Sequence, residues 1–82
     1  MMMKLFAVKD VKTEAYANPW CVRTEAVAIR GFAQACEDKE TDWHKFPDDF
    51  SLYELGDYNP ESGIINGHAD PKRLCSASEF VK

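Results

Sequence analysis

One stretch of this 82-residue chain repeats its apolar residues with the period of an amphipathic helix. In EAVAIRGFAQACED, which begins at Glu25, four apolar residues form a stripe at i, i+3, i+4 and i+7: Ile29, Phe32, Ala33 and Cys36. Thr24 precedes the stretch as an N-cap, and Glu25 is placed to interact with the positive end of the helix dipole. Gly31 costs up to about 1 kcal/mol of helix stability relative to alanine, and this predicts a close approach of the helix to a sheet.

A strand is predicted before this helix, over residues 3–11. The apolar run over residues 5–8 has the length of a strand that is covered on both faces. Alternation places Lys4, Phe6 and Val8 on one face and Leu5 and Lys9 on the other. We therefore expect Phe6 to belong to the core.

A hairpin is predicted after the helix. The sequence FSLYELGDY, residues 50–58, reads as a strand, and NPESG, residues 59–63, reads as its turn. Residues 64–68 are the expected returning strand. Residues 12–22 lack a clean period, and residues 69–82 are compatible with either a short helix or an edge strand. Residues 37–49 form a charged connector that Trp43 and Phe46 are expected to hold against the body.

These elements predict an α+β fold in which one helix packs on a small, mainly antiparallel sheet, in the order strand, helix, strand, strand. A chain of 82 residues is expected to form a single domain, residues 1–82. Such a thin sheet encloses a small hydrophobic core, and pairing with the sheet of a second copy would extend that core. A homodimer is therefore the expected assembly. No apolar run approaches the roughly 20 residues that are needed to span a bilayer, and the apolar run over residues 5–8 is too short for a secretory signal. We therefore expect a soluble, cytoplasmic protein without a membrane partner.

Three widely spaced cysteines occur in the chain: Cys21, Cys36 and Cys75. Their odd number makes a poor disulfide framework, so we expect reduced, buried thiols. With His44 and His68 they lack the local spacing of zinc ligands, and no metal or other cofactor is predicted.

Charge is distributed unevenly along the chain, whose net charge is −4. Residues 1–36 carry five basic and three acidic side chains, whereas residues 37–63 carry nine acidic and two basic ones. Such a polar molecule could offer one face to phosphates or pair head to tail with a second copy of itself. Two ordinary solvated surfaces explain the same pattern.

The sequence lacks a nucleophile motif and a glycine-rich phosphate loop, so we expect a protein without catalytic residues. Single-strand binders combine stacking rings with a positively charged track. The candidate nucleic-acid-binding residues are Lys4, Lys9, Lys12, Tyr16, Trp20, Arg23, Arg30 and Tyr53. Trp20 is more simply explained as a core residue in so small a protein.

The order of several short motifs resembles a known family. MKLFAVKDVKTEAY, NPW, AIRGFAQAC and FSLYELGDYNPESG follow one another as in the small non-structural protein of gokushovirus-type microviruses, which are single-stranded DNA phages. The resemblance spans nearly the whole chain. It also suggests Met3 as the usual start, with residues 1–2 as an extension.

The resemblance implies a viral protein that is made in the cytoplasm of the bacterial host and is absent from the mature virion. It implies binding of single-stranded DNA during genome replication or the switch to packaging. The alternative is a protein–protein interaction module that acts on a phage or host replication or capsid component through its acidic segment, residues 37–63.

Overall fold

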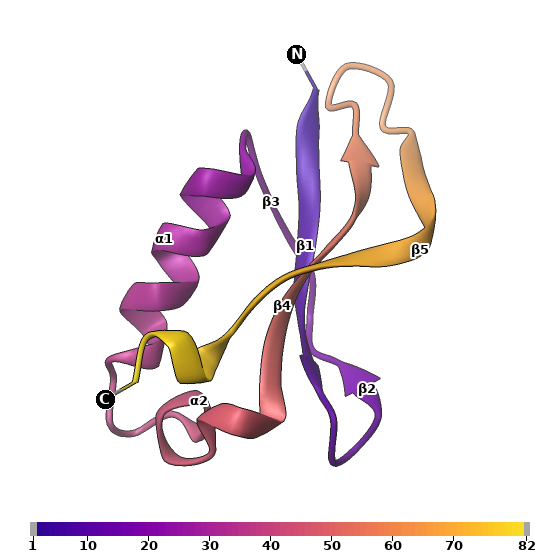
Figure 1. The fold of residues 1–82 in the computed structure, drawn as a ribbon. Coiled ribbons are helices and arrows are strands. Elements are labelled where there is room, and N and C mark those ends of the chain that lie inside the picture. The colour runs from indigo at the N-terminus through magenta and orange to yellow at the C-terminus, as the bar shows by residue number, and fades with distance from the viewer. Residues whose placement is uncertain (1, 82) are drawn as a thin grey trace.

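The computed structural model describes residues 2–81 (Figure 1). Met1, half of the expected extension, and Lys82 lie outside this range. The larger elements are β1 (Met3–Asp10), β2 (Ala15–Tyr16), β3 (Trp20–Val22), α1 (Glu25–Cys36), α2 (Asp42–Lys45), β4 (Phe50–Tyr58) and β5 (Ile65–Ser76). Two short 3-10 helices follow α2 and β5, at Pro47–Asp49 and Ala77–Glu79.

The strands form one antiparallel sheet in the order β2-β1-β4-β5. β3 also pairs with β1, on the same edge as β2 but at the other end of the strand, where Phe6 is opposite Trp20. The expected α+β class with a mainly antiparallel sheet is therefore confirmed. The expected element order was incomplete, because β2 and β3 come between β1 and α1.

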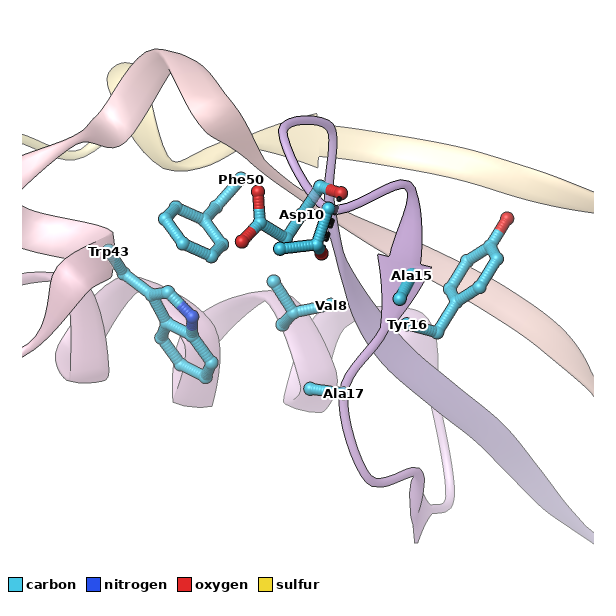
Figure 2. A pocket seen from close by; sticks show the side chains of 8 residues that line it. Val8, Asp10, Ala15, Tyr16, Ala17, Trp43 and Phe50 are labelled. Atoms are coloured by element: carbon cyan, nitrogen blue, oxygen red, sulfur yellow. Dashed lines mark hydrogen bonds between the residues drawn. The ribbon is translucent and has the colours of Figure 1, made fainter.

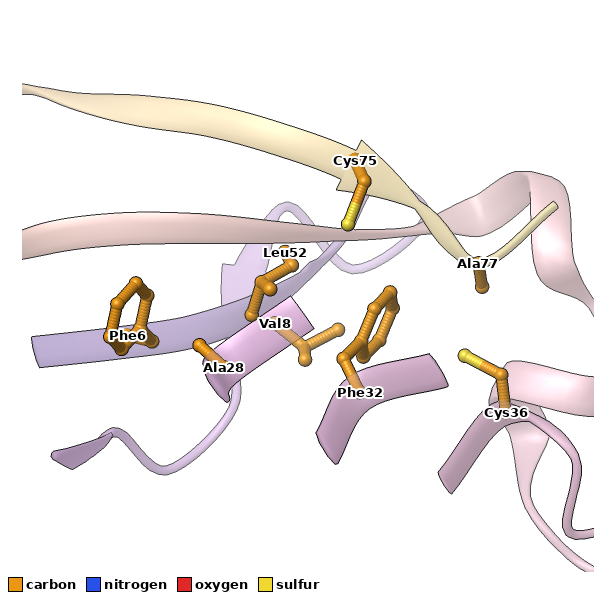
Figure 3. Packing of buried hydrophobic residues seen from close by; sticks show 8 residues of the cluster. All are labelled: Phe6, Val8, Ala28, Phe32, Cys36, Leu52, Cys75 and Ala77. Carbon is orange, nitrogen blue, oxygen red and sulfur yellow. The ribbon is translucent and has the colours of Figure 1, made fainter. Parts of the chain in front are cut away.

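The core lies between one face of this sheet and α1, and Figure 3 shows how the two layers meet. Its buried cluster consists of Phe6, Val8, Ala28, Phe32, Cys36, Leu52, Cys75 and Ala77. Phe6 is completely buried, as predicted, and Phe32 and Cys36 carry the apolar stripe of α1 into the core. None of the helices in the described range is long and apolar enough to span a membrane.

Helix α1 begins where the sequence predicts. The Val27 backbone N–H donates a hydrogen bond to Thr24 Oγ1 at 3.2 Å, which satisfies one of the free donors of the first turn. The prediction for Gly31 was wrong: this residue is exposed, and a Cβ placed there would meet nothing within 4 Å. Gly31 immediately precedes Phe32, and one residue corresponds to a rotation of about 100° around the helix axis, so Gly31 lies outside the buried stripe.

The charged connector folds into α2 and the first 3-10 helix. Trp43 packs against the core as predicted, with its ring centroid 5.2 Å from that of Phe32. The prediction was wrong for Phe46, which is 57% exposed. The chain leaves the helical path at Phe46 (φ −131°, ψ 60°), so this ring does not continue the face of α2 that Trp43 occupies.

The predicted hairpin turn is confirmed between β4 and β5. Gly63 takes a left-handed φ of 76°, and its N–H donates to the Asn59 carbonyl at 2.8 Å. β5 then runs to Ser76, well beyond the expected end at residue 68. It includes a wide bulge over residues 68–71, because the register steps from Gly56–Gly67 directly to Glu54–Lys72. The unassigned tail thus forms both an edge strand and a short 3-10 helix.

Candidate nucleic-acid interface

One face of the sheet is left uncovered by helices within residues 2–81, as Figure 1 shows. Val8 points into the core beneath α1, and side chains alternate along a strand, so Ala7 and Lys9 point to the opposite side. Residues directly opposite each other in antiparallel strands share a face. The register therefore adds Tyr16 opposite Lys9, Tyr53 opposite Ala7, and Arg73 opposite Tyr53. We call this side the open face.

Lys9, Tyr16, Tyr53 and Arg73 form the open-face cluster. The two tyrosine rings meet edge to face, with centroids 5.6 Å apart. Lys9 Nζ lies 5.6 Å from the Tyr16 centroid and 5.9 Å from the Tyr53 centroid. Cation–π contacts at exposed sites contribute only about 0.5–1 kcal/mol, so a phosphate can compete for the ammonium.

The cluster is partly accessible, with Lys9 and Tyr53 half-buried. Tyr16 is 40% exposed and Arg73 is exposed, and Figure 2 shows the Tyr16 ring turned away from Trp43 and Phe50 on the helix side. The register pairs of the open face contain no acidic residue within residues 2–81. This face is therefore basic and aromatic in a protein whose net charge is −4.

The structure does not bring all predicted contact residues to this face. Lys4 lies on the helix side, where its Nζ is 3.5 Å from Glu54 Oε1. Trp20 is half-buried there, with its ring centroid 6.3 Å from that of Phe6. Lys12 is exposed in the turn after β1. The two predicted arginines are also exposed elsewhere: Arg23 just before α1, and Arg30 on α1.

A second polar cluster lies on the helix side of the sheet around the buried carboxylate of Glu54. His68 Nε2, from the bulge of β5, lies 2.6 Å from Glu54 Oε2. Within residues 2–81, Oε1 makes no hydrogen bond and is balanced by the Lys4 ammonium alone. Burying a carboxylate is costly unless it is paired, so His68 and Lys4 make this position of Glu54 tolerable. The pairs connect β1, β4 and β5.

Glu25, at the start of α1, extends this cluster. Lys72 Nζ donates to Glu25 Oε2 at 3.0 Å. The neighbouring Glu54 side chain is the main cause that lowers the pKa of Glu25 below 4.5, and Lys72 lowers it further. The same carboxylate raises the pKa of Lys72. The arrangement is a charge-balanced structural link between α1 and the sheet.

All three cysteines are free thiols, as expected. Cys36 and Cys75 are buried, and Cys21 is half-buried in β3. Burial raises the pKa of Cys36 and of Cys75 from 9.0 to about 11. No three His, Cys, Asp or Glu side chains gather into a metal-binding group within residues 2–81.

The buried thiols predict a loss of stability in alkaline solution. The fold favours their neutral form, so this contribution is fully present below pH 9.0 and is lost as the pH rises towards about 11. Urea unfolding at several pH values should show it as a falling free energy of unfolding. The Cys36→Ala/Cys75→Ala variant lacks both buried thiols, and it should lose stability less steeply. Equal slopes for the two proteins would contradict the prediction.

Sequence reasoning missed two residues of these clusters. Arg73 lies in a segment without a clear period, and its place opposite Tyr53 depends on the register shift at Leu74, between the pairs Leu52–Cys75 and Tyr53–Arg73. His68 was considered only as a possible metal ligand, whereas it pairs with Glu54 across two strands. The HADPKR segment, with a proline and charges in a strand, is a typical edge-strand signal. That signal was available in the sequence.

Comparison with known proteins gives one match. The family described as Phage ORF5 protein matches residues 3–80, which is nearly the whole chain. No curated protein and no solved structure matches this chain. The family match covers β1 through the last 3-10 helix, and so includes both polar clusters described above. The chain is therefore a phage protein and belongs to the Phage ORF5 protein family.

Proposed function

We propose that this phage protein binds single-stranded nucleic acid through its open face, as a non-enzymatic accessory protein. The observation that carries the proposal is the position of Lys9, within 6 Å of two tyrosine ring centroids on an uncovered sheet. Bases stack on exposed aromatic rings irrespective of sequence, and adjacent cations hold the phosphates. Recognition modules with an open sheet use strand aromatics in the same way.

Each residue of the open-face cluster has a separate role in this proposal. Tyr16 and Tyr53 stack bases, and their edge-to-face contact (5.6 Å) sets the spacing of the two rings. Lys9 and Arg73 bind the backbone on either side of Tyr53. The cluster offers stacking surface and positive charge but contains no nucleophile paired with a base, so the proposed role is binding.

Binding of a fluorescent oligothymidine of roughly 16 nucleotides at about 50 and about 200 mM salt tests the proposal. Affinity should fall at the higher salt because phosphate neutralisation releases counterions. Tyr16→Ser should cost about 1–3 kcal/mol, the range for a stacked base. Lys9→Gln/Arg73→Gln should weaken binding and reduce the slope of log K against log salt by about 1.4, since each phosphate contact on a single strand accounts for about 0.7.

The matched control is Lys39→Gln/Lys45→Gln, which removes the same charge from the exposed surface of the connector. This variant should retain most of the affinity and the full salt slope. Failure of the wild-type protein to bind at low salt would refute the proposal. An equal loss of affinity in both double variants would mean that the oligonucleotide is held by non-specific charge attraction and not by the open-face cluster.

We also propose that the phage is a gokushovirus-type microvirus and that the protein acts on its single-stranded DNA in the host cytoplasm. The motifs from the MKLF start to the ELGDYNPESG hairpin support this origin. The role would lie in genome replication or in the switch to packaging, outside the mature virion. Crosslinking in infected cells should recover phage DNA with the protein, and purified virions should contain neither the protein nor its peptides.

A homodimer is the proposed assembly. The sheet has one covered face, and its α1-side core contains few large side chains, of which Phe6, Phe32 and Leu52 are the largest buried ones. Small domains commonly gain stability by association. Sedimentation equilibrium with and without the oligonucleotide measures the state directly, and a monomer throughout the accessible concentration range would contradict this assembly.

A further inference from the structure

An apolar groove runs along the helix side of the molecule, beside the sheet edge formed by β2 and β3. It consists of three adjoining hollows of about 270, 210 and 250 Å³. Trp20 and Trp43 line the first, and Trp43 also lines the second. Asp10 and Phe50 line both the second and the third. The hollows therefore adjoin one another in a row, which we call the groove, and Figure 2 shows its middle hollow between Trp43, Phe50 and Val8.

The charge around this groove is mostly negative. Asp10, Asp42 and Asp49 line its third hollow. Lys12 lines the same hollow and is the only basic residue among those that line the groove within residues 2–81. Phe46, 57% exposed, lies in the same hollow and leaves a large apolar ring in water. An exposed aromatic surface with an acidic rim is complementary to a partner that is both apolar and basic.

The size of the hollows indicates the form of that partner. Pockets for drug-sized ligands are about 300–1,000 Å³, and each of these hollows is smaller. A row of small hollows suits successive side chains of one peptide segment, which is how grooves read short linear motifs. The acidic rim disfavours a nucleic-acid strand, since aspartates repel phosphates.

We propose that this groove binds a basic segment of another protein, with aromatic or branched aliphatic side chains in the hollows and lysine or arginine on the acidic rim. The groove opens mainly on the helix side of the sheet, and Tyr16, which lines its second hollow, is the one residue that it shares with the open-face cluster. The variants below alter residues outside that cluster, so this proposal is tested independently of nucleic-acid binding. It also gives the acidic middle segment of the chain a defined surface.

Synthetic peptides of defined chemistry test the groove with the full-length protein. The probe is a fluorescent peptide of alternating arginine and leucine, compared with an arginine–serine peptide of equal charge and a glutamate–leucine peptide of opposite charge. Fluorescence anisotropy should detect binding of the arginine–leucine peptide alone, and the emission of Trp20 and Trp43 should change on binding. Equal binding of the arginine–serine peptide would overturn the proposal, because the hollows would then contribute nothing.

Variants locate the binding site. Asp42→Asn/Asp49→Asn should weaken the arginine–leucine peptide roughly threefold to tenfold, the range expected for two exposed ion pairs. The control Glu40→Gln/Asp48→Asn removes equal charge from exposed positions outside the groove lining and should change affinity less than twofold. Equal affinities for the two double variants would overturn the proposal.

A further variant guards against misfolding. If circular dichroism shows that Asp42→Asn/Asp49→Asn is unfolded, the Phe46→Ser variant, which changes an exposed side chain, replaces it and should also weaken binding of the arginine–leucine peptide. Sedimentation tests whether a second copy of this chain occupies the groove instead. If the protein self-associates, if Phe46→Ser abolishes that association, and if no peptide binds, the groove is a self-association site and the proposal is refuted.

Discussion

Replacing Phe32 with alanine is expected to reduce the free energy of unfolding by about 3–5 kcal/mol. Phe32 is 1% exposed at the centre of the core. Its ring lies 5.2 Å from Trp43 and 6.1 Å from Phe80, centroid to centroid, and thereby joins α1 to α2 and to the C-terminal segment. The loss would combine the transfer energy of a phenyl ring with a cavity between three elements. The free energy of unfolding of a folded domain is only about 5–15 kcal/mol in total, so the variant should be largely unfolded on modest warming.

Urea denaturation followed by circular dichroism measures this loss, and Phe46→Ala is the matched control. The same side chain is removed from a position that is 57% exposed, so the free energy of unfolding should change by about 0.5 kcal/mol or less. A Phe32→Ala protein as stable as the control would mean that the core does not depend on this ring. The Phe32→Leu variant, which refills part of the space, should recover part of the loss.

Adding one methyl group at Gly56 is expected to cost about 1–3 kcal/mol, as overpacking does. A Cβ on this residue would lie 2.1 Å from the Asn66 carbonyl oxygen and 2.8 Å from Gly67 Cα. Both atoms belong to the backbone of β5, which cannot move aside as the end of a flexible side chain can. Gly56→Ala should therefore separate the outer half of β5 from β4 at the Gly56–Gly67 pair. Faster amide hydrogen exchange in residues 65–67 would report the separation.

The same substitution at Gly31 should have the opposite sign. Gly31 is an exposed residue within α1, and a Cβ there meets nothing within 4 Å. Gly31→Ala should stabilise the protein by about 0.5–1 kcal/mol, because alanine loses less backbone entropy than glycine in a helix. Urea midpoints of the two variants should fall on opposite sides of the wild-type midpoint. Gains in both variants would show that β5 yields at Gly56 without cost.

The distribution of charge over the structure explains how a protein of net charge −4 can carry a basic surface. Lys9 and Arg73 lie on the open face, whose register pairs lack acidic residues in the described sheet. The carboxylates of Asp10, Asp42 and Asp49 line the groove on the helix side. Net charge alone would have favoured neither nucleic acid nor protein as partner, whereas the structure separates a basic surface from an acidic one.

The long elements were predictable because each of them carries its own local signal. The apolar stripe of α1, its Thr24 cap and the Asn59–Gly63 turn depend on residues within a few positions of one another. The two-residue β2 and three-residue β3 are too short to show a period, and they form because one edge of β1 is free to pair. Only that pairing identifies them as strands.

The candidate site was predictable in part for a related reason. Residue type selected Lys9, Tyr16 and Tyr53, and the structure places these three together. The same criterion also selected Lys4 and Trp20, which lie on the helix side in contact with Glu54 and Phe6. Alternation along β1 does separate Lys4 from Lys9, but composition cannot say which face a helix will cover.

The sequence by itself determined the fold class, α1, β1 and the β4–β5 hairpin, because local periods, caps and turn residues act over a few positions. Only the tertiary structure decided that Arg73 lies beside Tyr53 and that His68 reaches Glu54. The position of Arg73 depends on a one-residue register shift at Leu74, and that of His68 on the four-residue bulge in β5. A shift of one residue in a strand's register would turn these side chains to the opposite face. Register is set by the simultaneous pairing of distant segments across the sheet, and no single segment encodes it.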